Sequence, residues 1–211
     1  MINHFNTKLK LMNNYSFKYL RYLIYTDFYR ITEKLTVKNF LSALLNNEGF
    51  KYCFWMRVCK YLKHKKLLKL IFYPFAKGIL MHYKYKYGIA IPFTTSIGEG
   101  LYIGHFGGIL VNGKVMIGKN CNISQDVTLG HKVRGENRGS PTIGDNVYIA
   151  PGVKVFGNIK IGNNVAVGAN CVVTKDIPDY SVVVGIPGRV ISSEGSLGYI
   201  NFTDYKKFED F

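Results

Sequence analysis

The chain has 211 residues, and 47% of them are hydrophobic, which is enough for one or two domains with a buried core. Its net charge of +15 is concentrated at one end: residues 1–88 carry 17 Lys and Arg against 3 Asp and Glu, whereas residues 89–211 carry 11 against 10. The most apolar stretch, residues 67–81, is interrupted by Lys69, Pro74 and Lys77 and is therefore too short and too charged to span a bilayer. The first forty residues are rich in Lys, Arg, Asn and Tyr, which argues against a secretory signal. We expect a cytoplasmic protein with a basic N-terminal domain.

The first 88 residues predict an α-helical domain. Apolar periodicity and the positions of Gly and Pro predict helices over residues 15–30, 38–45, 50–63 and 66–87, the last of them broken at Pro74. The basic, aromatic surface of these helices leaves three interpretations open. It is a solvated face on a cap over the next domain, or a peripheral contact with anionic lipid headgroups at the membrane, or a nucleic-acid surface. The absence of a recognition motif argues against nucleic acid.

A six-residue repeat then organises the chain from residue 97 to residue 173. An Ile, Leu or Val occupies each repeat position, and most are followed by a small residue: Ile97, Ile103, Ile109, Ile117, Ile123, Leu129, Ile143, Ile149, Val155, Ile161, Val167 and Val173. A period of six fits neither an amphipathic helix nor a hairpin, but it suits a three-sided parallel coil with one short strand and one turn per side. Asn and Gly recur between the apolar positions and tolerate the positive φ of tight corners. We therefore expect a mainly β domain of about five coils.

Two interruptions of the repeat carry more information than its regular part. A two-residue insertion falls at Val115–Met116, and the polar, basic segment 131–141 must project as a loop. Loops on a rigid scaffold commonly carry function. The coil contains only two histidines, His131 at the start of this loop and His105 in the sequence Ile-Gly-His-Phe-Gly-Gly.

The four cysteines, Cys53, Cys59, Cys121 and Cys171, lack the spacing of a metal site. Cys121 and Cys171 fall on interior positions of the coil, where a small apolar side chain fits. We expect buried, unreactive thiols.

Three motifs together resemble those of the hexapeptide-repeat acyltransferases, in the serine acetyltransferase-like group that includes sugar O-acetyltransferases of surface polysaccharide biosynthesis. They are Gly-Leu-Tyr-Ile-Gly-His-Phe-Gly-Gly-Ile (100–109), Asn-Ile-Ser-Gln-Asp-Val-Thr-Leu-Gly (122–130) and Val-Val-Gly-Ile-Pro-Gly-Arg-Val-Ile (183–191). The resemblance covers about residues 87–192 and implies a left-handed parallel β-helix, a homotrimer and acetyl-CoA as cosubstrate. We expect a helical domain at 1–88, a left-handed β-helix at 89–192 with the loop 131–141, and a C-terminal tail at 193–211.

The resemblance also implies the site residues. The catalytic histidine of serine acetyltransferases falls on His105, and that of galactoside and maltose acetyltransferases falls on His131. An imidazole with a pKa near neutrality takes a proton from an acceptor hydroxyl and returns it to the departing thiolate. The family's acetyl-CoA contacts fall on Ala150, Ala169, Thr174, Lys175 and Arg189, and the two cations among them suit CoA phosphates.

The two histidines are separated by four six-residue sides once the insertion is subtracted. They therefore lie on different faces of one prism, and we expect them to meet across a trimer interface. Three residues of the serine acetyltransferase site are absent, because two Asp positions hold Ala90 and Gly104 and a second loop histidine is replaced by Ser140. His105 then needs another partner, such as a backbone carbonyl, Glu99 or Asp126.

These departures favour a sugar acceptor. We expect O-acetyl transfer from acetyl-CoA to a hydroxyl of a sugar or polysaccharide precursor, by direct attack and without an acyl-enzyme. Serine O-acetylation is the alternative. A zinc enzyme of the carbonic anhydrase type shares this coil but needs three histidine ligands where the coil has two, so no metal is expected. A non-catalytic scaffold that presents its basic face to membranes is the remaining alternative.

Overall fold

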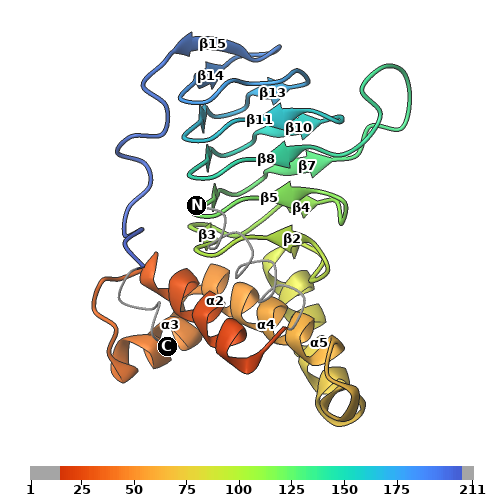
Figure 1. The fold of residues 1–211 in the computed structure, drawn as a ribbon, viewed down its shortest axis with the longest axis vertical. Helices are drawn as coiled ribbons and strands as arrows, with labels where there is room; N and C mark the ends of the chain where they lie inside the picture. Colours follow the sequence, from red (N-terminus) through yellow and green to blue (C-terminus); the bar gives the residue numbers. More distant parts are fainter. Residues whose placement is uncertain (1–14, 206–211) are drawn as a thin grey trace, which may run out of the picture.

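The computed structural model describes residues 15–205 and consists of a three-sided parallel β-helix standing on a layer of α-helices (Figure 1). The helices are α2 (Phe17–Tyr29), α3 (Val37–Asn46), α4 (Glu48–Lys63) and α5 (Lys66–Tyr87). Residues 1–14 and 206–211, which belong to the predicted N-terminal domain and tail, lie outside the described residues.

Local sequence explains where the helices begin and end. The side chains of Ser16, Thr36 and Asn47 each accept a hydrogen bond from a backbone N–H in the first turn of α2, α3 and α4. Gly88, in the left-handed conformation with φ 61°, ends α5. The predicted break at Pro74 is wrong, because α5 continues through it. Pro74 lies on an exposed part of the helix, where water can satisfy the carbonyl that its missing N–H leaves unbonded.

The β-helix has three sheets, one for each side of the prism. Sheet A contains β1 (Ile89–Ala90), β4 (Ile109–Val111), β7 (Thr128–Gly130), β10 (Lys154–Phe156) and β13 (Val172–Val173). Sheet B contains β2 (Ser96–Ile97), β5 (Met116–Ile117), β8 (Thr142–Ile143) and β11 (Lys160–Ile161). Sheet C contains β3 (Tyr102–Ile103), β6 (Asn122–Ile123), β9 (Tyr148–Ile149), β12 (Ala166–Val167), β14 (Val182–Val184) and β15 (Arg189–Ser192). All neighbours are parallel except β14 and β15.

The register of sheet B shows how the coils accommodate the interruptions. Ile97 pairs with Ile117, Ile117 with Ile143, Ile143 with Ile161, and Ile161 with Ile177. A regular coil of three six-residue sides takes 18 residues, as from Ile143 to Ile161. The coil with the Val115–Met116 insertion takes 20, the coil with the loop takes 26, and the last takes 16.

The core is the column of aliphatic side chains inside the prism. Each of the twelve repeat residues from Ile97 to Val173 is 6% exposed or less. All four cysteines are buried and free, as predicted. At one corner, Asn120, Asn146 and Asn164 adopt φ between 54° and 56°, and their side-chain amides bond one another in a ladder. The asparagines therefore make the tight turns and also fix the stacking of the coils.

Helix α4 closes the base of the β-helix. The first coil has no coil beneath it, so the backbone groups that face the helices need other partners in a buried place. The Tyr52 hydroxyl donates to the carbonyl of Ile91 at 2.8 Å and accepts from its N–H at 3.1 Å. The Lys60 ammonium donates to the carbonyl of Thr95 at 2.8 Å.

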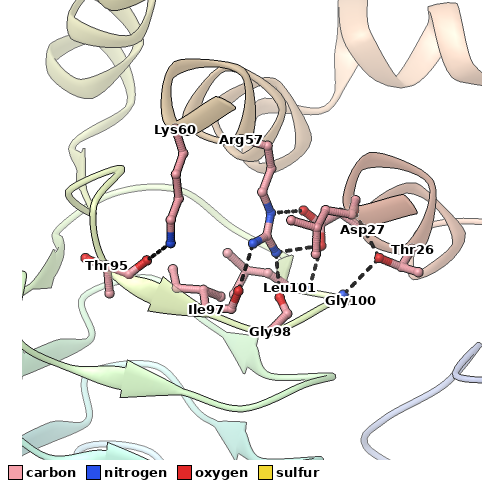
Figure 2. A network of polar contacts seen from close by, with 10 residues as sticks. Thr26, Asp27, Arg57, Lys60, Thr95, Ile97, Gly98, Gly100 and Leu101 are labelled. Atoms are coloured by element: carbon pink, nitrogen blue, oxygen red, sulfur yellow. Dashed lines mark hydrogen bonds and ion pairs between the residues drawn. The ribbon is translucent and has the colours of Figure 1, made fainter. Parts of the chain in front are cut away.

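The centre of this closure is a buried ion pair between α4 and α2 (Figure 2). Arg57 donates to both carboxylate oxygens of Asp27, at 2.9 and 3.1 Å, and also to the carbonyls of Ile97 and Gly98. Asp27 in turn accepts from the backbone N–H of Leu101. Burial lowers the pKa of Arg57, but the Asp27 carboxylate more than offsets this, so that pKa lies above its ordinary value. One charged pair thus binds two helices to the first coil.

Beyond β15, residues 193–205 run back along the prism to the helical layer (Figure 1). Tyr199 stacks on Tyr148 with ring centroids 4.5 Å apart, and its carbonyl accepts from the Asn122 side chain. The Tyr205 hydroxyl donates to the Asn120 side chain at 2.6 Å. The predicted tail is therefore packed against the coil as far as residue 205.

Candidate active site

His105 lies at the corner where the chain passes from sheet C to sheet A. It follows β3, and the turn that carries it leads into β4. The side chain is exposed, and within residues 15–205 its ring has no hydrogen-bond or ion-pair partner. Phe106, next to it, is half exposed and packs on Tyr87 of α5 with ring centroids 5.4 Å apart. The helical layer therefore reaches this corner of the prism.

The same corner recurs in each coil above His105. The register of β3, β6, β9 and β12 places Gln125, Pro151 and Ala169 at the position of His105 in successive coils, and Ala150 lies one residue before Pro151. Ala169 is exposed, whereas Ala150 is only 5% exposed and its N–H donates to the carbonyl of Val167. Sequence reasoning missed Gln125, whose side-chain oxygen is buried without a partner among the described residues. Its position two residues after Ile123 matches that of His105 after Ile103, which is a signal that was available.

His131 lies at a different corner, where sheet A passes into sheet B. It follows β7 and begins the projecting loop, which Figure 1 shows between β7 and β8. Lys132 and Gly139 exchange two backbone hydrogen bonds that close the neck of the loop. The neck brings His131 opposite Ser140, with Nδ1 3.1 Å from the serine Oγ.

A third residue completes this group. The Ser140 hydroxyl donates to Oδ1 of Asn112, at 3.3 Å. Asn112 directly follows β4, the neighbour of β7 in sheet A, and the pairing of Val111 with Leu129 brings it level with the start of the loop. Sequence reasoning missed Asn112, because its nearness to Ser140 depends on the register of two coils.

The structure does not bring the two histidines together within one chain. Thr174 and Lys175 follow β13 and share the corner of His131, and both are exposed. Arg189 is exposed on β15 at the far end of sheet C. The predicted site residues therefore divide into a group with His105 at one corner of sheet A, a group with His131 at the other corner, and Arg189 beyond them.

Asp126 and Glu99, the two carboxylates expected as partners of His105, do not bond its ring. The Asp126 carboxylate forms an ion pair with the Lys154 ammonium of β10, at 3.0 Å. The backbone N–H of Asp126 donates to the carbonyl of Gly107. Glu99 is 5% exposed, in the first coil. In this chain neither carboxylate bonds the His105 ring.

The cysteine thiols are poorly suited to form an acyl-enzyme. Burial raises the pKa of the Cys121 thiol to about 12, so the thiolate needed for an acyl-enzyme does not form near neutral pH. Among residues 15–205, no three His, Cys, Asp or Glu side chains are grouped as metal ligands.

The fold and the repeat define a class of protein, the hexapeptide-repeat transferases. The family model for the bacterial transferase hexapeptide (six repeats) matches residues 140–175. A serine acetyltransferase of Staphylococcus aureus is 42% identical over 123 residues, which are 58% of this chain and 58% of the relative. A serine acetyltransferase of Staphylococcus epidermidis is 42% identical over 138 residues, 65% of each chain. The match therefore spans about three fifths of the curated relatives' length.

Similar solved structures are also serine acetyltransferases. The serine acetyltransferase of Neisseria gonorrhoeae superposes with a TM-score of 0.69 at 28% identity, covering 86% of this chain and 69% of that one. The soybean serine acetyltransferase apoenzyme gives 0.65 at 31% identity, covering 82% and 69%. A serine acetyltransferase complex with CoA gives 0.66 at 25% identity, covering 87% and 73%. The chain belongs to the hexapeptide-repeat acyltransferases, in their serine acetyltransferase-like group, and the predicted left-handed β-helix with N-terminal helices is confirmed.

The comparisons correct the predicted acceptor. We expected a sugar hydroxyl and a role in polysaccharide biosynthesis, because Ala90, Gly104 and Ser140 replace residues of a serine site. That prediction is wrong, since the relatives by sequence and by structure are serine acetyltransferases. Three replaced positions do not outweigh a similarity of 42% identity over 58–65% of the chain.

Proposed function

We propose that the protein is an acetyl-CoA-dependent serine O-acetyltransferase. The observation that carries this proposal is the agreement between relatives found by sequence, at 42% identity, and structures found by fold. The buried thiols and the two exposed or half-exposed histidines support direct transfer with imidazole as the base. Since Gly104 replaces an Asp that helps to hold the amino acid, and Ala90 and Ser140 replace two further residues of a serine site, we expect a high KM for serine.

The proposed reaction is a single transfer in a ternary complex. An imidazole nitrogen takes the hydroxyl proton of serine, and the oxygen forms a bond to the thioester carbonyl carbon. The carbon–sulfur bond then breaks, and the departing thiolate takes the proton from the imidazolium. O-acetylserine and CoA are the products, and the imidazole returns to its neutral form.

We also propose that the site forms between subunits of a homotrimer. Sheet A separates the corner of His105, Ala150 and Ala169 from the corner of His131, Thr174 and Lys175. Cyclic assembly sets one corner of a subunit against the other corner of its neighbour and closes a groove between them. Acetyl-CoA would lie along this groove, with Lys175 and Arg189 available to its phosphates.

The test is release of CoA thiol from acetyl-CoA by the purified chain. We expect release with L-serine and only background release with L-alanine, which has the same backbone groups and no hydroxyl. The double variant His105→Ala/His131→Ala serves as the enzyme blank. Release that does not depend on serine would contradict the proposal.

We propose, separately, that the start of α5 contacts anionic lipid at a membrane surface. Leu67 and Leu70 are each 83% exposed, and Phe75 is 74% exposed. No Asp or Glu occurs between Glu48 and Glu99, whereas lysines recur along α5. Within residues 15–205 no helix is long and apolar enough to cross a bilayer. Exposed apolar side chains among lysines suit the interface of an anionic bilayer, and a second copy of the same basic face would be repelled.

Sedimentation with vesicles tests this contact. We expect binding to phosphatidylglycerol-containing vesicles, weaker binding to pure phosphatidylcholine, and loss of binding in Leu67→Glu/Leu70→Glu. Leu197→Glu is the matched control, because Leu197 is 87% exposed on the tail. If the double variant bound the vesicles as well as the original chain does, the contact would be refuted. It would also be refuted if the original chain bound no vesicles and the double variant changed only the oligomeric state.

A further inference from the structure

The hydrogen bonds around His131 have a direction that the structure fixes. Oδ1 of Asn112 accepts from the backbone N–H of Lys114, at 3.0 Å, and lies 3.3 Å from the Ser140 hydroxyl. A backbone N–H only donates, so this atom of Asn112 is its amide oxygen and not its NH₂ group. An amide oxygen only accepts. The Ser140 hydroxyl proton is therefore directed at Asn112.

The proton on His131 follows from this. Ser140 has one hydroxyl proton, and once that proton points to Asn112 the serine oxygen is left as an acceptor toward the ring. The Nδ1 atom of His131, 3.1 Å away, must then carry a proton to make its bond. A neutral imidazole protonated at Nδ1 has its lone pair on Nε2. Within residues 15–205, Nε2 has no hydrogen-bond partner.

We infer that Ser140 and Asn112 are positioning residues that hold His131 in the Nδ1–H tautomer, so that its Nε2 is the base for acetyl transfer. The inference rests on the proposed function and adds a base to it. When Nε2 takes the hydroxyl proton of the acceptor, the imidazolium keeps its Nδ1–H bond to Ser140. Neither the ring nor the serine has to reorient when Nε2 later gives the proton to the thiolate.

The surrounding backbone makes this arrangement rigid. The Lys132–Gly139 pair closes the loop neck on one side, and the pairing of Val111 with Leu129 fixes Asn112 on the other. The ring of His105, by contrast, has no partner within the described residues. The serine acetyltransferase resemblance puts the base at His105, whereas the hydrogen bonds of this chain prepare His131.

Nitrogen NMR of the histidine side chains reads the tautomer directly, without activity. The five histidines of the ¹⁵N-labelled full chain are observed above pH 7, and His131 is assigned by its loss in His131→Ala. We expect Nδ1 protonated in the original chain and in Ser140→Thr, which keeps the hydroxyl. In Ser140→Ala we expect a shift toward the Nε2–H form, because nothing then selects the Nδ1–H tautomer. Glu136→Ala, in the exposed part of the same loop, should leave the signal unchanged.

Kinetics supply the second readout. We expect Ser140→Ala to lower kcat roughly tenfold to a hundredfold with little change in the KM for acetyl-CoA, because loss of the positioning residue should cost less than the factor of about 10² to 10⁴ that the general base itself contributes. Ser140→Thr should restore kcat, and His131→Ala should lose at least as much as Ser140→Ala.

An Nε2–H signal in the original chain would overturn the inference, as would an unchanged signal in Ser140→Ala or full activity in His131→Ala. An original chain that shows Nδ1–H, loses it in Ser140→Ala and yet releases no CoA with serine would refute the proposed acceptor and leave the tautomer assignment standing.

Discussion

Lys60 is a cation placed where its charge is costly. It reaches from α4 to the carbonyl of Thr95 at the base of the β-helix, and its ammonium lies 5.4 Å from the centre of the Tyr15 ring. Burial, with a smaller effect of the Arg57 charge, lowers its pKa to about 8. The folded chain therefore releases this proton at a lower pH than the unfolded chain does.

The sign of the stability effect follows from linkage. Between about pH 8 and the ordinary lysine pKa of 10.5, the unfolded chain holds more protons at this site, so Lys60 makes the free energy of unfolding rise with pH. Buried tyrosines with raised pKa values act in the opposite direction, so the informative quantity is a difference between variants. We expect the free energy of unfolding of the original chain, relative to that of Lys60→Met, to increase from pH 8 to pH 10.

Urea unfolding at pH 7, 8, 9 and 10 measures this gap, with Lys63→Met, an exposed lysine of the same helix, as control. Parallel pH profiles for the original chain and Lys60→Met would show that Lys60 is not the group responsible.

At the level of elements, α4 acts as the missing coil beneath the first coil. The side chains of Tyr52, Arg57 and Lys60 meet backbone groups that a further strand would otherwise pair. Figure 2 shows that Arg57 donates hydrogen bonds both to Asp27 of α2 and to the backbone of the first coil. Removing one member of a buried pair leaves the other charge without compensation.

We expect Arg57→Met to lower the free energy of unfolding by about 3–5 kcal/mol, because Asp27 and two carbonyls lose their partner. Lys38→Met, on the exposed part of α3, should change it by less than about 0.5 kcal/mol. Chemical denaturation of both variants makes the comparison, and a loss below about 1 kcal/mol for Arg57→Met would mean that the ion pair contributes little.

Some of these elements were predictable from sequence and others were not. The period of six residues placed the strands, because Ile, Leu and Val must fill a narrow interior. It also placed the loop and His131, because a long polar segment cannot enter the prism. The tail and Asn112 were not predictable, since their contacts join residues far apart in the chain. The division into domains at 88 and 192 stays a prediction. Tyr52 and Leu80, which precede residue 88, belong to the same hydrophobic core as the coil.

At the scale of the whole molecule, the position of the two histidines decides how many subunits make a site. His105 follows a strand of sheet C and His131 follows a strand of sheet A, so one chain presents them at separate corners. A site that uses both needs two chains. The assembly then becomes part of the catalytic unit.

Mixing of variants tests this directly. If His105→Ala and His131→Ala are each nearly inactive, trimers reassembled from an equal mixture should regain about a quarter of the sites, because random cyclic assembly pairs one intact corner with another at that frequency. Activity is measured after subunit exchange has been verified with differently tagged chains. An exchanged mixture that remains inactive would show that the two histidines do not combine between subunits.

A stack of parallel strands has two open ends, and each is a template on which another chain could add. In this protein the lower end is covered by α2 and α4. At the upper end the chain turns back, so that β15 lies antiparallel on β14, and residues 185–188 bond both the N–H and the carbonyl of Val172. The upper edges of sheets A and C are thus covered by the chain's own residues. This cover opposes end-to-end growth of the coil into fibres and favours association through its sides, where the trimer is proposed.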